Sequence, residues 1–440
     1  MAVSQTHTKT PTGAPSSEAF VQRLFDAVLG TLDVQAAYLG DRLGYYRALA
    51  GHDDGLTSTE LAARSGPAER YAREWLEHQA VTGFLVTNPD DDAMSRRYVL
   101  PVEHRGALTD ELSLDHVLPL ARLVVGAGKQ ADALVQAYRT GDGVSWERLG
   151  DDVREAQAAA NRPMFLHRLG STYLASVPDI DAALGAGGRV ADIGCGLGWS
   201  SIGIALAYPE STVDGYDVDL PSVEAARRNA HGAGVGDRVR FHVADAARHS
   251  TQAGRYDVVT AFECIHDLPD PVGVLSTMRA LAGPDGIVLV MDERVAEAFT
   301  APGDDIERLM DGYSLMCCLP DGMSHQPSAA TGTVMRPQTL HRYATHAGFA
   351  ETEVLDVHDD FFRWRLAPGP GRAGARAPRG PGRRLRRPQG ADGAPRPDHG
   401  VARLAGVADG VPHPRPLPAG RRGGGPRDGR GRRGAGRLPA

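Results

Sequence analysis

The feature that most restricts how this chain can fold is a glycine-rich loop followed, one strand later, by an acidic residue. Residues 192–198 read Asp-Ile-Gly-Cys-Gly-Leu-Gly, between an apolar run and a helix-like segment from Trp199 to Tyr208. Glycine is needed where the backbone turns tightly against a ligand, because a Cβ would collide there. Asp217 ends the next strand-like run, where a carboxylate can accept both hydroxyls of a ribose. The pattern therefore indicates a nucleoside-containing cofactor.

Strand-like and helix-like segments alternate around this loop, which is typical of an α/β domain with a parallel sheet. We expect seven strands, at Arg189–Ile193, Thr212–Asp217, Val239–Val243, Tyr256–Phe262, Gly286–Asp292, Glu353–Val357 and Phe361–Leu366. Only a few residues separate the last two, which is too few for a crossover helix, so the final strand should run antiparallel. The sequence thus predicts a seven-stranded Rossmann-like sheet over residues 181–366.

A nicotinamide dinucleotide is the alternative ligand for such a loop. Its fingerprint is G-x-G-x-x-G, which places a helix N-terminus against a pyrophosphate. Here Gly198 comes one residue too early for that pattern, and the loop lies mid-chain behind a helical region. A dehydrogenase is therefore the weaker interpretation.

Residues 18–108 have the pattern of a helical, winged-helix domain. The expected elements are helices at 19–32, 34–49 and 68–81, a short helix capped by Thr57 or Ser58, and wing strands at 84–87 and 97–100. In a DNA-binding domain the helix 68–81 would enter the major groove. Its polar face mixes acidic and basic residues, which phosphates would not favour, so we expect a structural or dimerising role. Residues 109–180 are predicted to be a helical linker that contributes to the substrate pocket.

Charge is distributed unevenly along the chain. The net charge is −7, but residues from Leu366 onward hold 17 Arg and 4 Asp, which leaves 31 basic and 51 acidic residues elsewhere. The folded part is therefore acidic and poorly suited to nucleic acid. Residues 1–17 are polar and expected to be disordered, and no apolar run approaches the roughly 20 residues that span a bilayer. Because the four cysteines lack disulfide or zinc spacing, we expect a cytoplasmic protein without a metal.

Residues 367–440 differ in composition from the rest. Gly, Ala, Pro and Arg make up 60 of these 74 residues, so the segment cannot bury a core. One interpretation is a disordered basic arm for nucleic acid or an anionic surface. The other is that the tail is an out-of-frame product of a frameshift near Leu366, because all four residue types are encoded by G/C-rich codons. We favour the second interpretation.

Three successive motifs resemble those of class I S-adenosylmethionine-dependent methyltransferases. They are the loop 192–198, Asp217 and the run Val-Ala-Asp-Ala at 243–246, within a resemblance that covers about residues 180–366. The resemblance implies S-adenosylmethionine as the cofactor. It assigns cofactor contacts to Asp192, Gly194, Gly196, Gly198, Asp217, Val218, Asp245, Ala246 and Phe262.

The implied roles within this set differ. The glycine loop would lie behind the methionine half of the cofactor, and Asp217, with Val218 beside it, would bind the ribose hydroxyls. Asp245 would accept a hydrogen bond from the adenine amino group next to Ala246, and Phe262 would line the site near the sulfonium.

With its winged helix, the whole chain is similar to small-molecule O-methyltransferases of the plant and polyketide-tailoring type. Residues 262–270, Phe-Glu-Cys-Ile-His-Asp-Leu-Pro-Asp, resemble the stretch after the fourth strand that carries the general base of that family. The resemblance implies His266 as the base, Asp267 beside it, and Glu293 as the carboxylate that orients it. It also implies a homodimer and a small, aromatic or polyketide-like acceptor.

A physical argument supports His266 independently of the resemblance. A phenol with a pKa near 10 can pass its proton to an imidazole whose ordinary pKa is about 6.5, and a neighbouring carboxylate stabilises the imidazolium that forms. Two positions depart from the family pattern. Leu268 replaces the Trp after His-Asp, and Val334 stands where plant-type enzymes carry a second Glu. Nitrogen and carbon acceptors therefore stay open beside oxygen.

Residues 299–334 form an apolar, methionine-rich insertion after the fifth strand. The insertion is expected either to roof the acceptor site or to form a dimer surface. A competing function for the whole chain is a winged-helix transcriptional regulator whose methyltransferase-like domain senses the cofactor.

Overall fold

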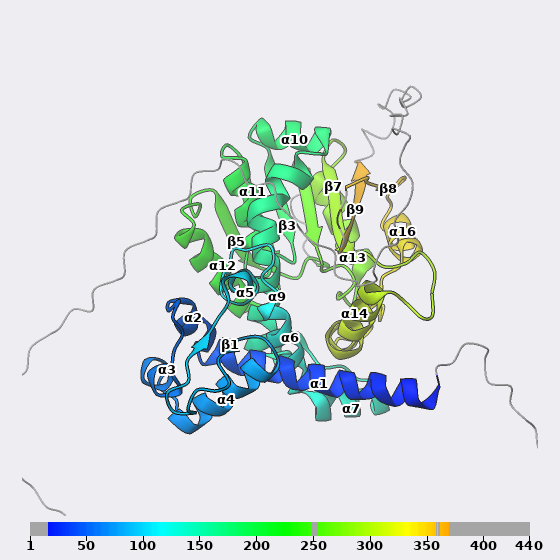
Figure 1. The fold of residues 1–440 in the computed structure, drawn as a ribbon. Helices are drawn as coiled ribbons and strands as arrows, with labels where there is room; N and C mark the ends of the chain where they lie inside the picture. The colour runs from blue at the N-terminus through cyan, green and yellow to red at the C-terminus, as the bar shows by residue number, and fades with distance from the viewer. Residues whose placement is uncertain (1–15, 249–253, 358, 360, 369–440) are drawn as a thin grey trace, which may run out of the picture. The chain divides into compact units, whose positions relative to one another are not determined.

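The computed structural model describes residues 16–248, 254–357, 359 and 361–368. The expectations for residues 1–15 and 369–440 lie outside the described residues. The N-terminal region comprises α1 (Ser17–Arg42), α2 (Tyr45–Ala50), α3 (Ser58–Ser65), α4 (Glu69–Val81), β1 (Val86–Thr87), β2 (Tyr98–Val99) and α5 (Val102–Leu108). β1 pairs antiparallel with β2, as expected of a wing (Figure 1).

The boundary between the first two helices differs from the prediction. α1 continues through Asp33, where the sequence suggested a break, because this partly exposed side chain is tolerated on the helix surface. The chain turns instead at Gly44, whose φ of 70° is left-handed and favours glycine. Thr57 caps α3 as predicted, in a reciprocal pair of hydrogen bonds with Glu60.

Aromatic side chains form much of the N-terminal core. Tyr45, Tyr46, Trp75 and Tyr98 are buried in one cluster with aliphatic residues from α2 to β2. The indole Nε1 of Trp75 donates to the carbonyl of Ala36 at 2.8 Å, which joins α4 to α1. The winged helix therefore folds around its own apolar core.

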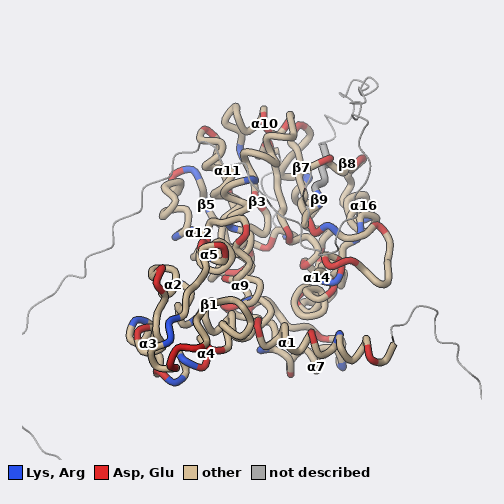
Figure 2. Tube along the Cα trace, in the orientation of Figure 1, with Lys and Arg blue, Asp and Glu red and all other residues tan. Residues whose placement is uncertain are grey.

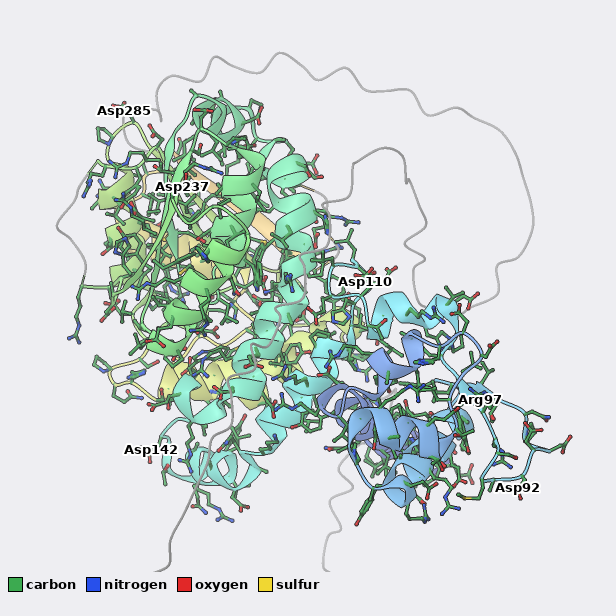
Figure 3. All side chains as sticks on the ribbon, turned by 90° about the vertical axis from the view of Figure 1, so that its left-hand side faces the viewer. Asp92, Arg97, Asp110, Asp142, Asp237 and Asp285 are labelled. Atoms are coloured by element: carbon green, nitrogen blue, oxygen red, sulfur yellow. The ribbon has the colours of Figure 1, made fainter. Side chains whose placement is uncertain are left out.

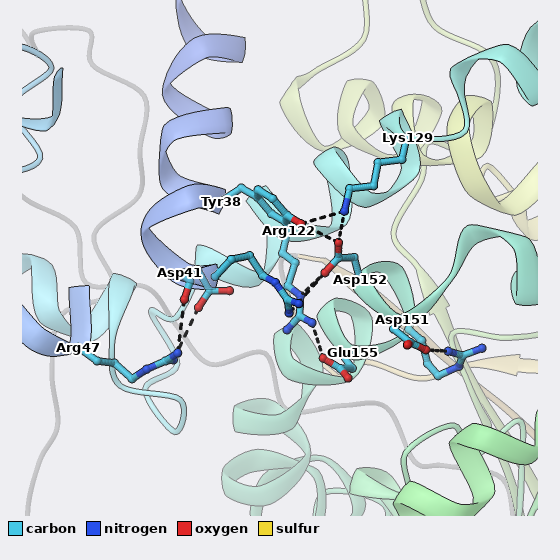
Figure 4. Close-up of polar contacts among 10 residues, drawn as sticks. Tyr38, Asp41, Arg47, Arg122, Lys129, Asp151, Asp152 and Glu155 are labelled. Atoms are coloured by element: carbon cyan, nitrogen blue, oxygen red, sulfur yellow. Dashed lines mark hydrogen bonds and ion pairs between the residues drawn. The ribbon is translucent and has the colours of Figure 1, made fainter. Parts of the chain in front are cut away.

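A helical connection leads from this region to the sheet. It comprises α6 (Leu118–Gly128), α7 (Ala131–Thr140), α8 (Trp146–Leu149), α9 (Asp151–Met164), the π-helix η1 (Phe165–Leu174) and α10 (Pro178–Gly185). Asp152 of α9 accepts from Tyr38 of α1 at 2.9 Å, from Arg122 of α6 at 3.0 Å and from Lys129, which directly follows α6, at 2.5 Å (Figure 4). These contacts lower the pKa of Asp152 to about 2, against the opposing effect of burial, and hold three helices together.

The central sheet has seven strands in the order β5-β4-β3-β6-β7-β9-β8. The strands are β3 (Arg189–Ile193), β4 (Thr212–Asp217), β5 (Val239–Val243), β6 (Val258–Phe262), β7 (Ile287–Glu293), β8 (Glu353–Val354) and β9 (Phe362–Pro368). β9 runs antiparallel to both β7 and β8, which confirms the predicted direction of the final strand. The sheet is thus the predicted α/β architecture.

Helices cover both faces of the sheet. η1, α10, α11 (Trp199–Ala207) and α12 (Leu220–Gly232) pack on one face through residues such as Leu169, Ile202 and Val223. α13 (Pro271–Ala282) and α16 (Pro337–His346) pack on the other face through Met278 and Leu340 (Figure 1). Among the helices of the described residues, none combines the length and apolar character needed to cross a bilayer.

The insertion after β7 folds into α14 (Asp305–Tyr313), the π-helix η2 (Ser314–Cys318) and α15 (Leu319–Met323). Cys317 is buried in a cluster with Leu123 of α6 and Leu134 of α7. The carboxylate of Asp321 also accepts from the Trp146 backbone N–H at 2.7 Å. The insertion therefore packs on the helical connection of its own chain.

Candidate active site

The three glycines of the loop after β3 have different neighbours. All three have left-handed backbone, with φ of 67° at Gly194, 50° at Gly196 and 84° at Gly198. A Cβ on Gly198 would lie 2.6 Å from the ring of Phe241, and one on Gly194 would lie 2.7 Å from Cys264 Sγ. At Gly196, no described atom lies within 4 Å of that position. The loop thus turns its middle glycine toward open space.

Asp192 supports the loop from within. Its buried carboxylate accepts hydrogen bonds from Ser200 at 2.6 Å, Ser201 at 2.7 Å and Thr260 at 2.8 Å. Burial raises the pKa of Asp192, while these hydroxyls favour the ionised form. The side chain fixes the start of α11 and β6 to β3 rather than extending toward the open side of the loop.

Asp217 joins the glycine loop to the following turn. One carboxylate oxygen accepts from the Gly196 N–H at 2.8 Å, and the other accepts from the Asp219 N–H at 2.9 Å. Burial raises the pKa of Asp217, and the two N–H donors partly oppose that rise. The next residue, Val218, is 65 % exposed, so an apolar surface lies beside the carboxylate.

The other predicted cofactor residues lie at the ends of β5 and β6. Asp245 is half-exposed, accepts from the Ala247 N–H at 2.9 Å and pairs with Arg248 at 3.2 Å, with Ala246 partly buried between them. Phe262 is buried, with its ring centroid 5.7 Å from that of Phe165. All of these residues follow or end parallel strands, so they share one edge of the sheet.

His266 is buried among three carboxylates. Its Nδ1 lies 2.8 Å from Asp292 Oδ1 and 3.0 Å from Glu293 Oε2, and its Nε2 lies 3.1 Å from Asp267 Oδ1. Burial disfavours the imidazolium, but Asp267, Glu293 and Asp292 outweigh it and raise the pKa of His266 well above 6.5. The structure thus brings together the three residues that the sequence singled out, and it adds Asp292.

A second residue missed in the sequence is Glu263. It has a φ of 53°, which is strained for a residue with a side chain. Its Oε2 accepts from Gln157 at 3.1 Å and Asn161 at 3.0 Å, both on α9. Its buried Oε1 accepts no hydrogen bond from the described residues, and burial raises the pKa of Glu263 to about 8. Glu263 stands in the stretch 262–270 that the sequence singled out, but its two amide partners on α9 lie about 100 residues earlier in the chain.

The segment that carries His266 also contacts the insertion. The Gly332 N–H donates to the His266 carbonyl at 3.2 Å, and the Ala329 N–H donates to the Pro269 carbonyl at 2.8 Å. The end of the insertion therefore lies beside the segment that carries His266, and both expectations for the insertion stay predictions.

Two family models match the chain. One, described as a methyltransferase domain, matches residues 184–345, and the other, described as an Rv2258c-like winged HTH domain, matches residues 34–110. The ubiquinone biosynthesis O-methyltransferase of Aromatoleum aromaticum is 30 % identical over 173 residues, which cover 39 % of this chain and 68 % of that protein. The chain belongs to the S-adenosylmethionine-dependent methyltransferases. The resemblance seen in the sequence is thereby confirmed.

Other relatives of this methyltransferase match over smaller shares of their own length. The 27-O-demethylrifamycin SV methyltransferase of Amycolatopsis mediterranei is 34 % identical over 128 residues, or 29 % of this chain and 47 % of that protein. The first two curated relatives each match over 63 % of their own length, and the third matches over 44 %. The chain therefore spans about half to two thirds of the length of the curated relatives it matches.

Solved structures share the fold of this methyltransferase. The mitomycin 7-O-methyltransferase MmcR superposes with a TM-score of 0.59 at 20 % identity, covering 80 % of this chain and 98 % of that one. Human N-acetylserotonin methyltransferase superposes with a TM-score of 0.56 at 19 % identity, covering 81 % and 99 %.

The site fits the family cofactor on three observations. The open side of Gly196 leaves room for a ligand against the backbone, Asp217 presents a carboxylate next to it, and exposed Val218 offers an apolar surface for a base. A carboxylate acceptor for the ribose hydroxyls, an apolar surface for the base and an open backbone are the features that such a nucleoside requires.

Proposed function

We propose that this methyltransferase transfers a methyl group from S-adenosylmethionine to a hydroxyl of a small, aromatic or polyketide-like acceptor. The observation that carries the proposal is the contact between the glycine loop and the segment of His266. A Cβ at Gly194 would lie 2.7 Å from Cys264 Sγ, two residues before His266. β3 and β6 are also parallel neighbours, so both segments leave the sheet at one edge.

S-adenosylmethionine, when bound, supplies an electrophilic methyl group. The chain's part is then to hold the cofactor and the acceptor in line, since positioning accounts for much of the rate of such a displacement. We assign the cofactor to the loop 194–198, Asp217, Val218, Asp245, Ala246 and Phe262. Asp192 contributes by fixing the loop through its three hydroxyl partners.

We place activation of the acceptor hydroxyl at Nε2 of His266. Because Nδ1 donates to Asp292, we assign the hydroxyl proton to Nε2, which lies 3.1 Å from Asp267 Oδ1 and can accept that proton only when the ring is neutral. Asp292 and Glu293 hold the ring and stabilise positive charge on it, and Asp267 lies beside Nε2. Replacing His266 by Ala should lower turnover by about 10²-fold or more while S-adenosylhomocysteine still binds. Unchanged turnover would show that His266 does not take part in the reaction.

The names of two relatives support the acceptor class. The mitomycin 7-O-methyltransferase and the 27-O-demethylrifamycin SV methyltransferase are named for methylation at an oxygen of mitomycin and of a rifamycin.

We also propose a homodimer through α1. Every residue from 16 to 32 is exposed, although this stretch is rich in large apolar side chains: Phe20, Val21, Leu24, Phe25, Val28, Leu29 and Leu32. A single helix with such an apolar surface is not stable in water without a partner. A second copy, packing the same helix around a two-fold axis, would cover it symmetrically.

The charges on the winged helix are poorly suited to binding nucleic acid. Arg70 pairs with Glu74, and Arg73 lies 3.5 Å from Glu69, all on α4. Acidic and basic residues alternate over α3 and α4 (Figure 2). Because phosphate binding needs unneutralised positive charge, we assign this region to structure and dimerisation.

A further inference from the structure

Glu263 has one carboxyl oxygen that the fold leaves without a partner. Its Oε2 accepts hydrogen bonds from the side-chain amides of Gln157 at 3.1 Å and Asn161 at 3.0 Å. Its Oε1 is buried and accepts no hydrogen bond from the part of the chain that the structure describes. The backbone of Glu263 is also strained, with a φ of 53°, and its N–H donates to the Met291 carbonyl at 2.9 Å. Strain and an unpartnered buried oxygen in one residue indicate contact with a ligand.

The elements around Glu263 place it beside the glycine loop. β3 and β6 are parallel neighbours, so the loop and Glu263 follow strand ends at the same edge of the sheet. A Cβ on Gly194 would lie 2.7 Å from the Sγ of Cys264, the residue after Glu263. Glu263 therefore lies next to the loop to which we assign the cofactor, and the inference below rests on that part of the proposed function.

Helix α9 connects Glu263 to the other loops at this edge. Arg154, near the start of α9, pairs with Asp219, which follows β4, at 2.7 Å. The guanidinium of Arg162, near the end of α9, lies 4.3 Å from the ring centroid of Trp199, the first residue of α11. Glu263 contacts α9 between these two points. The helix therefore lies across the carboxyl ends of β3, β4 and β6, and it holds Glu263 at the edge where the cofactor is assigned.

We propose that Oε1 of Glu263 binds the ammonium group at the amino-acid end of the cofactor. That end carries one ammonium and one carboxylate. α11 begins at Trp199, directly after the glycine loop, and no side chain among the described residues caps it. Its N-terminus carries partial positive charge, which favours the carboxylate and disfavours the ammonium. The ammonium therefore requires an acceptor elsewhere, and Oε1 of Glu263 is a buried, unpartnered acceptor beside the loop.

The charge of Glu263 can adjust to this ligand. Without a ligand, burial outweighs the hydrogen bond from Asn161 and raises the pKa of Glu263 to about 8, so the carboxyl carries a proton at neutral pH. An ammonium beside the carboxyl favours the ionised form and lowers that pKa, and the proton leaves to solvent. The amides of Gln157 and Asn161 then stabilise the carboxylate through Oε2. Glu263 would thus let the site select nucleosides that carry an amino-acid end.

Calorimetry at neutral pH with two nucleosides tests this contact. S-adenosylhomocysteine has the amino-acid end, whereas 5′-methylthioadenosine lacks it. The full-length unmodified protein should bind S-adenosylhomocysteine about 10-fold more tightly or better. Glu263→Gln should raise the Kd for S-adenosylhomocysteine about 10-fold or more and leave the Kd for 5′-methylthioadenosine unchanged. Glu155→Gln is the matched control, because it removes an exposed carboxylate from α9 and should change neither Kd.

Three results would overturn the ammonium contact alone: equal affinity of the unmodified protein for both nucleosides, equal weakening of both by Glu263→Gln, or no weakening of S-adenosylhomocysteine by that change. Circular dichroism shows whether the variant is folded, and Glu263→Met, which keeps the length of the side chain without its charge, replaces it where it is not. If the unmodified protein bound neither nucleoside, the cofactor assignment in the proposed function would be wrong instead.

Discussion

Nδ1 of His266 donates a hydrogen bond to Oδ1 of Asp292 at 2.8 Å, and both side chains are buried. This bond fixes the tautomer and direction of the ring, which a buried imidazole could not hold by packing alone. Glu293, the carboxylate that the sequence indicated for this task, lies 3.0 Å from the same nitrogen. Orientation of the ring is therefore shared between two adjacent residues of β7.

Replacing Asp292 by Asn should lower turnover by about 10²-fold or more, because the amide no longer stabilises positive charge on the ring. Calorimetry should show unchanged binding of S-adenosylhomocysteine, since within the described residues no hydrogen bond or ion pair joins Asp292 to residues 194–198. Asp285→Asn is the control: this exposed residue precedes the other end of β7 (Figure 3) and should leave turnover unchanged. Equal effects of both changes would contradict a specific role for Asp292.

Two glycines of one loop should respond differently to alanine. Gly196→Ala meets no described atom within 4 Å, so it should cost only the roughly 1–2 kcal/mol of a left-handed backbone. Its Cβ would occupy the ligand side, so the Kd for S-adenosylhomocysteine should rise about 10-fold or more. Gly198→Ala places a Cβ 2.9 Å from Ala226 and closer still to Phe241, so it should lower Tm much further. Thermal unfolding and calorimetry on both variants would show whether the effects separate in this way.

Glu263 should make stability depend on pH. Burial raises the pKa of its carboxyl from 4.5 to about 8, so the folded protein holds this proton more tightly than the unfolded chain does. Its contribution to stability is therefore greatest below about pH 4.5 and is lost as the pH rises toward about 8. Glu263→Gln keeps an acceptor for Gln157 and Asn161 but cannot ionise.

The Tm of Glu263→Gln relative to the unmodified protein should thus be lowest near pH 5 and rise steadily up to about pH 8. Glu103→Gln, at an exposed position of α5, should show no such trend. If the difference between Glu263→Gln and the unmodified protein stayed constant over this range, the carboxyl would not be protonated in the fold at neutral pH.

The apolar surface of α1 should control oligomeric state. Leu24 is 59 % exposed in the middle of this surface, and a charge there would be buried without a partner in the dimer. Leu24→Asp should therefore shift the protein from dimer to monomer in sedimentation velocity. Val81→Asp, at an 87 % exposed position of α4, should leave the dimer intact. If the unmodified protein were a monomer, the proposed dimer through α1 would be wrong.

Much of the fold was visible in the sequence because its determinants are local. The ranges predicted for β3, β4 and β5 agree with the observed bounds, since each is a short strand-like segment with Val or aromatic residues. The antiparallel β9 followed from the shortness of its link to β8. The glycines of the loop were recognisable because left-handed backbone and close packing exclude other residues. The misplaced break in α1 is also local: the sequence offered Asp33, but the left-handed turn forms at Gly44.

By itself, the sequence determined the sheet, the glycine loop, and the residues Asp217, His266 and Glu293 as a candidate site. Only the tertiary structure showed that Asp192 faces three hydroxyls, that Asp292 holds the imidazole, and that Cys318 lies beside Asp267. The reason is physical: hydrogen-bond partners and ligand sets depend on distances between segments far apart in the chain, which no spacing along it encodes. Local backbone conformation depends on residues that are neighbours in the sequence. Contacts between buried side chains depend on how distant segments pack.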